Sequence, residues 1–314
     1  MGILRILKEN ATFNAVFRSV LKGSSKLSVN IHSFLIKRWS PSGILECTFG
    51  SYKFKYYNKC DDGLPSYFYY DLPYQEKADL NLFIELSKKS HTIVDIGANT
   101  GLFSVLASIA NPGAIIHSIE PYSINAERMR VNLKLNAVKN VTVHEIAIAD
   151  KDGEIAISIP QDNTISDVSS ANSSFSKAVY PTIKWVEKIV KSQTLDTFEK
   201  KNNIKIDLIK CDVETFEMSV FKGAGSILEK DRPTIIFECF LDDERKLFFS
   251  EILSKYNYYA YLILEQGVVY SGEGFVNVGF GLNYLITPVK PSQTFIGYAD
   301  TTSLCEKLLN NVTV

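Results

Sequence analysis

The residues best suited to chemistry lie in two motifs that follow short apolar segments. The first motif is Asp95-Ile-Gly-Ala-Asn-Thr-Gly101. Glycines directly after an apolar segment indicate the turn from a buried strand into a helix. The second motif is Glu120-Pro121, which ends the apolar segment 115–119. A carboxylate at such a strand end can accept hydrogen bonds from both ribose hydroxyls of a nucleoside.

The glycine spacing of the first motif disfavours a ligand with phosphates. Dinucleotide folds use G-x-G-x-x-G, because three glycines let the backbone and a helix N-terminus close around a pyrophosphate. Here Asn99 and Thr100 stand where that cradle needs bare backbone, and no Gly-Lys-Ser/Thr phosphate loop is present. S-adenosylmethionine (SAM), a nucleoside with an amino-acid tail and a sulfonium, suits the motif better. We therefore expect SAM as the cofactor, with a nicotinamide enzyme of the same fold as the rival.

From about residue 90 to about residue 240 the chain resembles the FkbM-type SAM-dependent methyltransferases. The matching segments are, in order, 94–101, 119–121, 147–150, 194–196, 209–214, 221–225 and 235–238. This resemblance implies methyl transfer, usually to a hydroxyl oxygen of a small molecule, sugar or glycan. The chain departs from the family at Thr215, where the usual motif has a glycine. Because a β-branched residue accepts only ordinary helical or extended geometry, we expect a reshaped acceptor side of the pocket.

The motifs assign cofactor-binding and catalytic roles to particular residues. We expect cofactor binding by Asp95, Gly97, Asn99 and Gly101 for the amino-acid half of SAM, by Glu120 for the ribose, and by Ala147 and Asp150 at the adenine edge. Candidates to take the proton of an alcohol acceptor are Asp212, Glu214, Glu217 and Glu238. Structural roles are the alternative for Glu214 and Glu217 at a helix N-terminus and for Asp150 in a turn. Asp196 is expected to be structural, in a capping box with Glu199.

The elements that must position these residues alternate between strand and helix. Strands are predicted at 91–96, 114–119, 141–148, 205–211 and 233–239, and helices at 100–110, 123–136, 215–229 and 242–256. This alternation predicts a parallel, doubly wound sheet with its ligand at the carboxyl ends of the strands. An added antiparallel pair is predicted at 154–160 and 185–194, and a reversed terminal hairpin at 258–264 and 281–287. The predicted fold class is the class I methyltransferase fold, a Rossmann-like three-layer α/β/α sheet.

We predict three regions along the chain. An accessory region at 1–74, with a β-hairpin at 44–57, precedes the methyltransferase domain at 75–290 and a C-terminal tail at 291–314. Residues 1–40 are basic, with apolar residues near helical spacing. This segment either docks on the domain or makes peripheral contact with an anionic membrane surface. The polar loop from Gln161 to Tyr180 is either a surface linker or a lid over the acceptor.

Composition disfavours several classes of function. The 314 residues include 34 Lys and Arg and 35 Asp and Glu, so the chain has no net positive charge that would attract nucleic acid. Five cysteines without a Cys-x-x-Cys pair indicate a reduced, cytoplasmic protein, and the lack of a His/Cys cluster disfavours a metal. No apolar run approaches the roughly 20 residues that span a bilayer. The alternative to an enzyme is a non-catalytic protein of this fold that binds a glycan or a membrane surface; the acceptor and the oligomeric state stay open.

Overall fold

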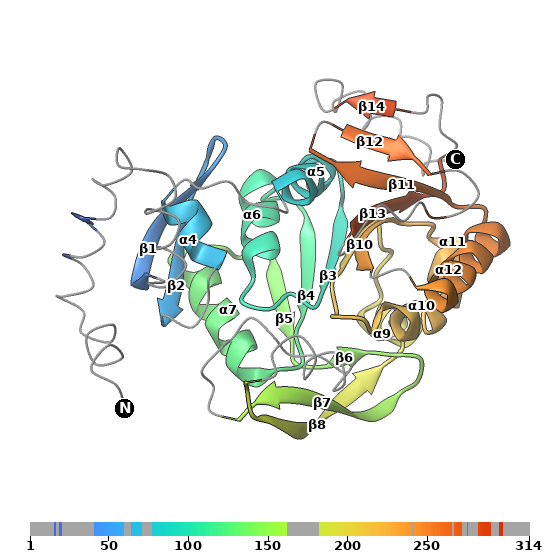
Figure 1. Cartoon of the computed structure of the whole chain (residues 1–314), viewed down its shortest axis with the longest axis horizontal. Helices are drawn as coiled ribbons and strands as arrows, with labels where there is room; N and C mark the ends of the chain where they lie inside the picture. The colour runs from blue at the N-terminus through green and yellow to red at the C-terminus, as the bar shows by residue number, and fades with distance from the viewer. Residues whose placement is uncertain are drawn as a thin grey trace.

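A central nine-stranded sheet runs through the computed structural model of the chain (Figure 1). The structure describes residues 16, 19–20, 41–59, 64–70, 77–161, 182–239, 242–265, 267–271, 275, 282–289 and 295–297. The parallel strands of the sheet are β3 Thr92–Ile96, β4 Ile115–Ile119, β5 Val141–His144, β9 Leu208–Cys211 and β10 Thr234–Cys239. Its antiparallel strands are β11 Tyr259–Leu264, β12 Gly267–Tyr270, β13 Leu282–Thr287 and β14 Phe295–Gly297.

The order of the strands determines where a ligand can bind. From one edge to the other the strands run β14-β12-β11-β13-β10-β9-β3-β4-β5. The chain builds outward from β3 through β4 to β5, and then returns to place β9 on the other side of β3. In a doubly wound sheet, ligands bind beyond the carboxyl ends of the strands where this reversal occurs. The crevice is therefore expected at the ends of β3, β4 and β9.

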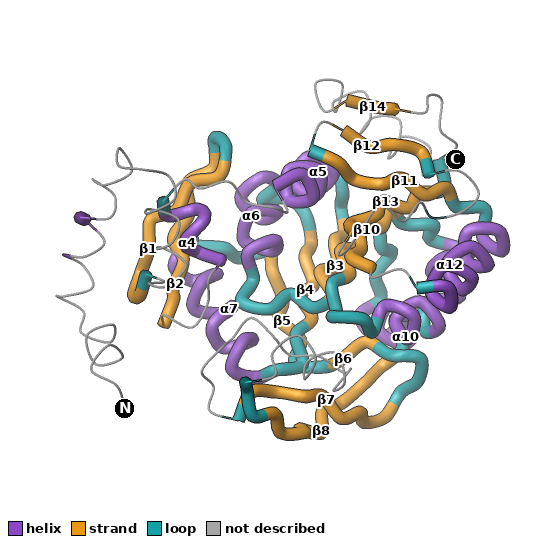
Figure 2. Tube along the Cα trace, viewed as in Figure 1, coloured by secondary structure: helices purple, strands orange, loops and turns teal. Residues whose placement is uncertain are grey.

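The parallel strands are stable in the centre because they are apolar and covered on both faces. Every residue of β3 and of β9 is buried. One face packs against α5 Lys77–Ser87, α6 Leu102–Ala110 and α7 Ser123–Leu135. The other face packs against α9 Leu195–Asn202, α10 Glu217–Lys222, α11 Gly225–Lys230 and α12 Asp243–Tyr256. Figure 2 shows these helices on the two sides of the strands, and the predicted three-layer α/β/α class is confirmed.

The predicted N-terminal hairpin is also present. Strands β1 Ser42–Phe49 and β2 Tyr52–Lys59 pair antiparallel, and α4 Leu64–Tyr69 follows them. The apolar side chains of the hairpin, including Leu45 and Phe54, lie in the same core as Phe83 of α5 and Leu102 of α6. At the other end, β14 pairs with β12, so residues assigned to the C-terminal tail add a strand to the main sheet.

The predicted strand at 141–148 is wrong as a single element. Its first half is β5 in the main sheet, whereas its second half is β6 Ala147–Ile148 in a separate three-stranded sheet. The other strands of that sheet are β7 Gly153–Pro160 and β8 Trp185–Gln193, the predicted antiparallel pair. The alternating apolar residues of this segment would fit a strand of either sheet. Parallel pairing of β6 with β8, which is remote in sequence, decides which sheet this segment joins.

The predicted helix at 215–229 is two helices, α10 and α11, which meet at Gly223. A side chain at Gly223 would place its Cβ 2.2 Å from the carbonyl oxygen of Ala149, so the chain packs there through bare backbone. The predicted capping box at Asp196 is also wrong. Thr194 caps α9 through its side chain, whereas the Asp196 carboxylate accepts hydrogen bonds from the backbone N–H groups of Ser226 and Ile227 at the start of α11. Asp196 is therefore structural, as predicted, but it caps a different helix.

Two predictions concern segments that the structure leaves largely undescribed. The amphipathic segment 1–40 lies outside the described residues except at positions 16, 19 and 20. The loop from Gln161 to Tyr180 lies outside them after its first residue. Over the described part of the chain, none of the helices combines the length and the apolar character needed to cross a membrane.

Candidate functional site

A cleft lies where the strand order reverses, beyond the ends of β3, β4 and β9. It encloses about 700 Å³ of empty space, including its open mouth. Its polar lining comes from the two motif loops and the end of β9: Gly97, Asn99, Glu120, Asp212 and Glu214. Its apolar lining consists of Ile96, Ile119, Pro121, Ile146, Ala147, Ile148, Ile155, Ile157, Val213 and Phe216.

Gly97 lets the ends of β3 and β9 approach each other. It has a φ of 78°, and a Cβ at this position would lie 1.7 Å from the carbonyl oxygen of Asp212. The N–H groups of Gly97 and Ala98 both donate to the carbonyl oxygen of Ile119, at 2.9 and 3.0 Å. The glycine therefore joins three strand ends into one floor for the cleft, since only glycine combines this dihedral with this close approach.

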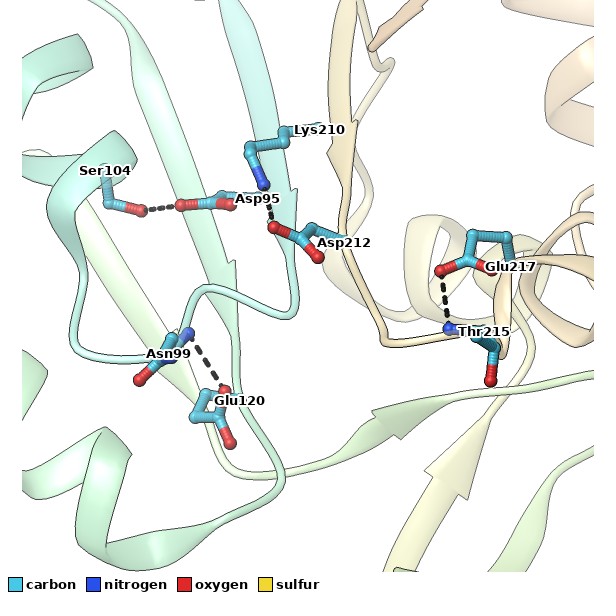
Figure 3. Close-up of polar contacts among 8 residues, drawn as sticks. All are labelled: Asp95, Asn99, Ser104, Glu120, Lys210, Asp212, Thr215 and Glu217. Carbon is cyan, nitrogen blue, oxygen red and sulfur yellow. Dashed lines mark hydrogen bonds and ion pairs between the residues drawn. The ribbon is translucent and has the colours of Figure 1, made fainter. Parts of the chain in front are cut away.

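Glu120 connects the second strand end to the cofactor loop. Its Oε2 accepts a hydrogen bond from the N–H of Asn99 at 2.9 Å (Figure 3). Its Oε1 accepts one from the N–H of Tyr122 at 2.8 Å. The side chain is only 2% exposed, yet it lines the cleft. A carboxylate oxygen can accept more than one hydrogen bond. Glu120 can therefore hold the loop and a ribose at the same time.

Asp95, the first acid of the motif, lies behind the cleft wall. Its Oδ2 accepts a hydrogen bond from the Ser104 hydroxyl at 2.6 Å, and its Oδ1 is buried without a hydrogen-bond partner among the described residues. Burial raises the pKa of Asp95, while the positive charge of Lys210 acts to lower it. The side chain is 1% exposed and does not line the cleft.

Lys210 is a functional candidate that the sequence reasoning missed. Its Nζ lies 2.7 Å from Oδ2 of Asp212 (Figure 3). The same Nζ lies 4.2 Å from the centre of the Phe103 ring, and the residue is 6% exposed. Its backbone pairs with Asp95 across the parallel strands. One buried cation therefore acts on two carboxylates, Asp95 behind the cleft wall and Asp212 in the cleft lining. A lysine inside the otherwise apolar strand Leu208–Cys211 was the available signal, because lysine is almost never buried unless it is paired.

The turn after Asp212 corrects the expectation for Thr215. Glu214 and Thr215 have φ values of 51° and 72°, so the threonine adopts the left-handed geometry that its family glycine would adopt without strain. The prediction of ordinary helical or extended geometry at Thr215 is therefore wrong. The N–H of Thr215 donates to Oε1 of Glu217 at 3.1 Å, which holds the turn from behind (Figure 3). Contacts of this kind can maintain a backbone geometry that is unfavourable in isolation.

The structure brings some predicted site residues together and places others elsewhere. Six of them line the cleft: Gly97, Asn99, Glu120, Ala147, Asp212 and Glu214. Five do not: Asp95, Gly101, Asp150, Glu217 and Glu238. Gly101 precedes α6 and packs against Met129, whereas Asp150 bonds to Ser219 through both its N–H and its carboxylate. Glu238 is partly buried on β10, opposite Asn283 of β13.

Glu217 is buried behind the wall of the cleft. It is 2% exposed, and burial, together with the negative charge of Asp212, raises the pKa of its carboxyl group to about 7. Glu217 accepts a hydrogen bond from Thr215 and does not line the cleft, so it supports the turn after Asp212.

Apolar residues that the sequence reasoning did not assign form one wall of the cleft. Ile155 and Ile157 of β7, in the three-stranded sheet, line the cleft together with Ile119 and Ile148. Their spacing of two residues was the available signal, since alternate residues of a strand share a face. The cleft thus combines an apolar wall that suits a flat ring with a carboxylate that suits hydroxyl groups. Among the described residues, no group of three or more His, Cys, Asp and Glu side chains is arranged to hold a metal ion.

Comparisons with known proteins place the chain among methyltransferases. Residues 95–263 match the methyltransferase FkbM domain, which is more than half of the chain. "Methyltransferase 1" of Beauveria bassiana (strain ARSEF 2860) is 27% identical over 144 residues, which cover 42% of this chain and 57% of that protein. This chain therefore spans little more than half the length of that curated relative.

Two solved structures show a similar arrangement at low identity. The methyltransferase FkbM from Methylobacillus flagellatus KT has a TM-score of 0.42 and 17% identity, with 63% of this chain and 43% of that chain covered. The O-methyltransferase from Bacillus cereus in complex with SAH has a TM-score of 0.40 and 14% identity, with 69% of this chain and 82% of that chain covered. Because the family domain matches more than half of its residues, the chain belongs to the FkbM methyltransferase family.

Proposed function

We propose that the protein uses SAM to methylate a hydroxyl oxygen of a sugar, glycan or small-molecule acceptor. Family membership supports methyl transfer. The observation that carries the choice of cofactor is Glu120, a carboxylate at the end of β4 that lines the cleft and is tied to the Asn99 loop. A carboxylate at this point of a doubly wound sheet is the usual partner of ribose hydroxyls.

The other residues of the cleft fit the remaining parts of SAM. Ile119, Ile155 and Ile157 offer an apolar surface for adenine, and the loop from Gly97 to Asn99 offers backbone groups for the amino-acid half. SAM supplies a methyl group on a positively charged sulfur, which an acceptor oxygen displaces in line. Holding the two reactants in that alignment accounts for several kcal/mol of the barrier. The acidic groups Asp212 and Glu214 lie at the same cleft and suit a cationic ligand.

The proton of the acceptor hydroxyl needs a base at the cleft. Asp212 and Glu214 line the cleft, whereas Glu217 and Glu238 do not. The Asp212 side chain is 28% exposed, and its Oδ2 is held by Lys210. A fixed carboxylate that remains accessible can accept a proton late in methyl transfer. We therefore infer that Asp212 is the base and that Glu214 helps to position the acceptor.

The cofactor assignment predicts a large effect at Glu120. Replacing Glu120 with alanine should weaken binding of S-adenosylhomocysteine (SAH), measured by calorimetry, by about 2 to 3 kcal/mol. Hydrogen bonds to a charged group contribute roughly 1.5–3 kcal/mol each, and the change also frees the N–H of Asn99. The control is Glu145→Ala, which removes an exposed carboxylate paired with Arg130 and should leave SAH affinity unchanged. Equal affinity of Glu120→Ala and wild type would refute the ribose assignment.

The assignment of the base predicts a selective loss of turnover. Asp212→Asn should lower the rate of methyl transfer roughly 10²- to 10⁴-fold, the usual contribution of a general base, while SAH affinity changes little. Transfer is measured with labelled SAM and fractionated lipid, glycan and small-molecule extracts. Glu145→Gln serves as the control with normal turnover. Normal turnover in Asp212→Asn would exclude it as the base, and a wild-type protein that binds SAH but modifies no fraction would favour the non-catalytic alternative.

A further inference from the structure

The hairpin β1–β2 lies outside the matched family domain yet contacts the cofactor loop directly. The family match begins at residue 95, whereas the hairpin ends at Lys59. Figure 1 shows β2 beside α6 and α7, the helices that follow β3 and β4. The side chains of Tyr56 and Phe54 lie in one apolar core with Ala98 and Leu102, which flank the loop. The hairpin is therefore packed onto the loop rather than onto a remote surface.

Two hydrogen-bonded connections lead from β2 to Thr100 in this loop. The hydroxyl of Tyr56 shares a hydrogen bond with the hydroxyl of Thr100. The N–H of Tyr57 donates to Oδ1 of Asn132 at 2.7 Å, and Nδ2 of the same asparagine donates to the carbonyl oxygen of Thr100 at 2.8 Å. Tyr56 and Thr100 are each 1% exposed and Asn132 is fully buried. Buried hydrogen bonds are costly to break, because the groups left behind find no water.

The loop needs such support because of its own backbone geometry. Asn99 has a φ of 50° and Gly101 has a φ of 89°, so Thr100 stands between two residues in left-handed conformations. Such conformations persist when the surrounding structure determines them. On one side, Glu120 holds the N–H of Asn99. On the other side, the hairpin and Asn132 hold both the hydroxyl and the carbonyl group of Thr100.

We propose that hairpin β1–β2 is part of the cofactor site, with Tyr56 and Asn132 as positioning residues that fix the loop Asn99–Gly101 through Thr100. This inference rests on the proposed use of SAM by the same cleft. The hairpin keeps Asn99 in register with Glu120, so that the loop is already in its binding geometry before the ligand arrives. A preorganised loop binds more tightly, because less ordering remains to be done on binding.

The test compares two buried tyrosine hydroxyls by SAH calorimetry with the full chain. Tyr56→Phe removes only the hydroxyl that meets Thr100 and should weaken SAH binding about 3- to 10-fold, the effect of one neutral hydrogen bond. The matched control is Tyr258→Phe, which removes a buried hydroxyl that donates to the carbonyl oxygen of Pro233 outside the cleft lining, and which should bind SAH within about twofold of wild type. Thermal unfolding of each variant identifies a temperature at which all of them are folded, and calorimetry is carried out at that temperature.

A double-mutant cycle separates positioning from general stability. Thr100→Val should weaken SAH binding as much as Tyr56→Phe does. Thr100→Ser, which keeps the hydroxyl, should bind SAH like the wild-type protein. The double variant Tyr56→Phe/Thr100→Val should bind no more weakly than either single variant. Unchanged affinity in Tyr56→Phe, or losses that simply multiply in the double variant, would overturn the inference and leave the proposed function intact. Failure of the wild-type protein to bind SAH would overturn the proposed function and this inference together.

Discussion

Replacing Gly97 with alanine should lower the free energy of unfolding by about 3 kcal/mol and abolish detectable SAH binding. The new Cβ would lie 1.7 Å from the carbonyl oxygen of Asp212 and 2.8 Å from its carbonyl carbon. The two strand ends cannot simply separate, because the N–H of Asp212 donates to the carbonyl oxygen of Ile96 at 2.9 Å. Overpacking costs roughly 1–3 kcal/mol, and a left-handed φ adds about 1–2 kcal/mol for a residue other than glycine.

A second glycine provides the control for this prediction. Gly113 lies in the turn before β4, where an added Cβ would be 3.4 Å from the nearest atom, Oδ1 of Asn111, and φ is not in the left-handed range. Gly113→Ala should therefore change the free energy of unfolding by less than about 0.5 kcal/mol. Urea denaturation measures both variants. Equal stability of Gly97→Ala and Gly113→Ala would show that the ends of β3 and β9 are not in contact.

Replacing Lys210 with methionine should lower the free energy of unfolding by about 2 to 4 kcal/mol. Removing one partner of a buried ion pair typically costs 3–5 kcal/mol, and the 28% exposure of Asp212 reduces this figure. Methionine keeps the apolar contact with Phe103 but leaves Asp95 and Asp212 without their shared cation. The loss should therefore come from charge rather than from packing.

The pH dependence of this loss has a definite sign. Burial raises the pKa of Asp95 and Lys210 acts to lower it, so removal of the lysine raises that pKa further. A carboxyl group with a raised folded-state pKa binds a proton more readily in the folded than in the unfolded protein, so folding loses stability as the pH rises through that range. The deficit of Lys210→Met should accordingly be smaller at pH 5 than at pH 8.

Urea denaturation at the two pH values tests this prediction. Lys191→Met, on an exposed position of β8, is the control and should be nearly neutral at both. The double variant Lys210→Met/Asp212→Asn should recover part of the lost stability, because it removes one of the two uncompensated charges. A deficit that does not depend on pH would contradict the assignment of Lys210 as the shared cation.

Residue patterns were enough to predict the class of fold and the part of the candidate site that lies in the two motifs. Apolar segments followed by glycine or by a carboxylate are local signals, and each records a strand end within a few residues. Gly97, Asn99 and Glu120 were located in this way, and the structure places all three at one cleft. Parallel strands bring their carboxyl ends to the same edge of a sheet, so the order of the motifs along the chain was sufficient.

Residue patterns could not predict which acids reach the cleft or which contacts support them, because both depend on how distant segments pack. Asp95 and Glu217 resemble site residues in sequence, but their side chains lie behind the wall in contact with Ser104 and Thr215. Lys210 forms an ion pair with Asp212 and lies beside Asp95, which is on another strand. Tyr56 shares a hydrogen bond with Thr100, which lies 44 positions away in the sequence. Such contacts depend on the direction of a side chain and on the packing of segments distant in sequence, and neither is encoded in local residue spacing.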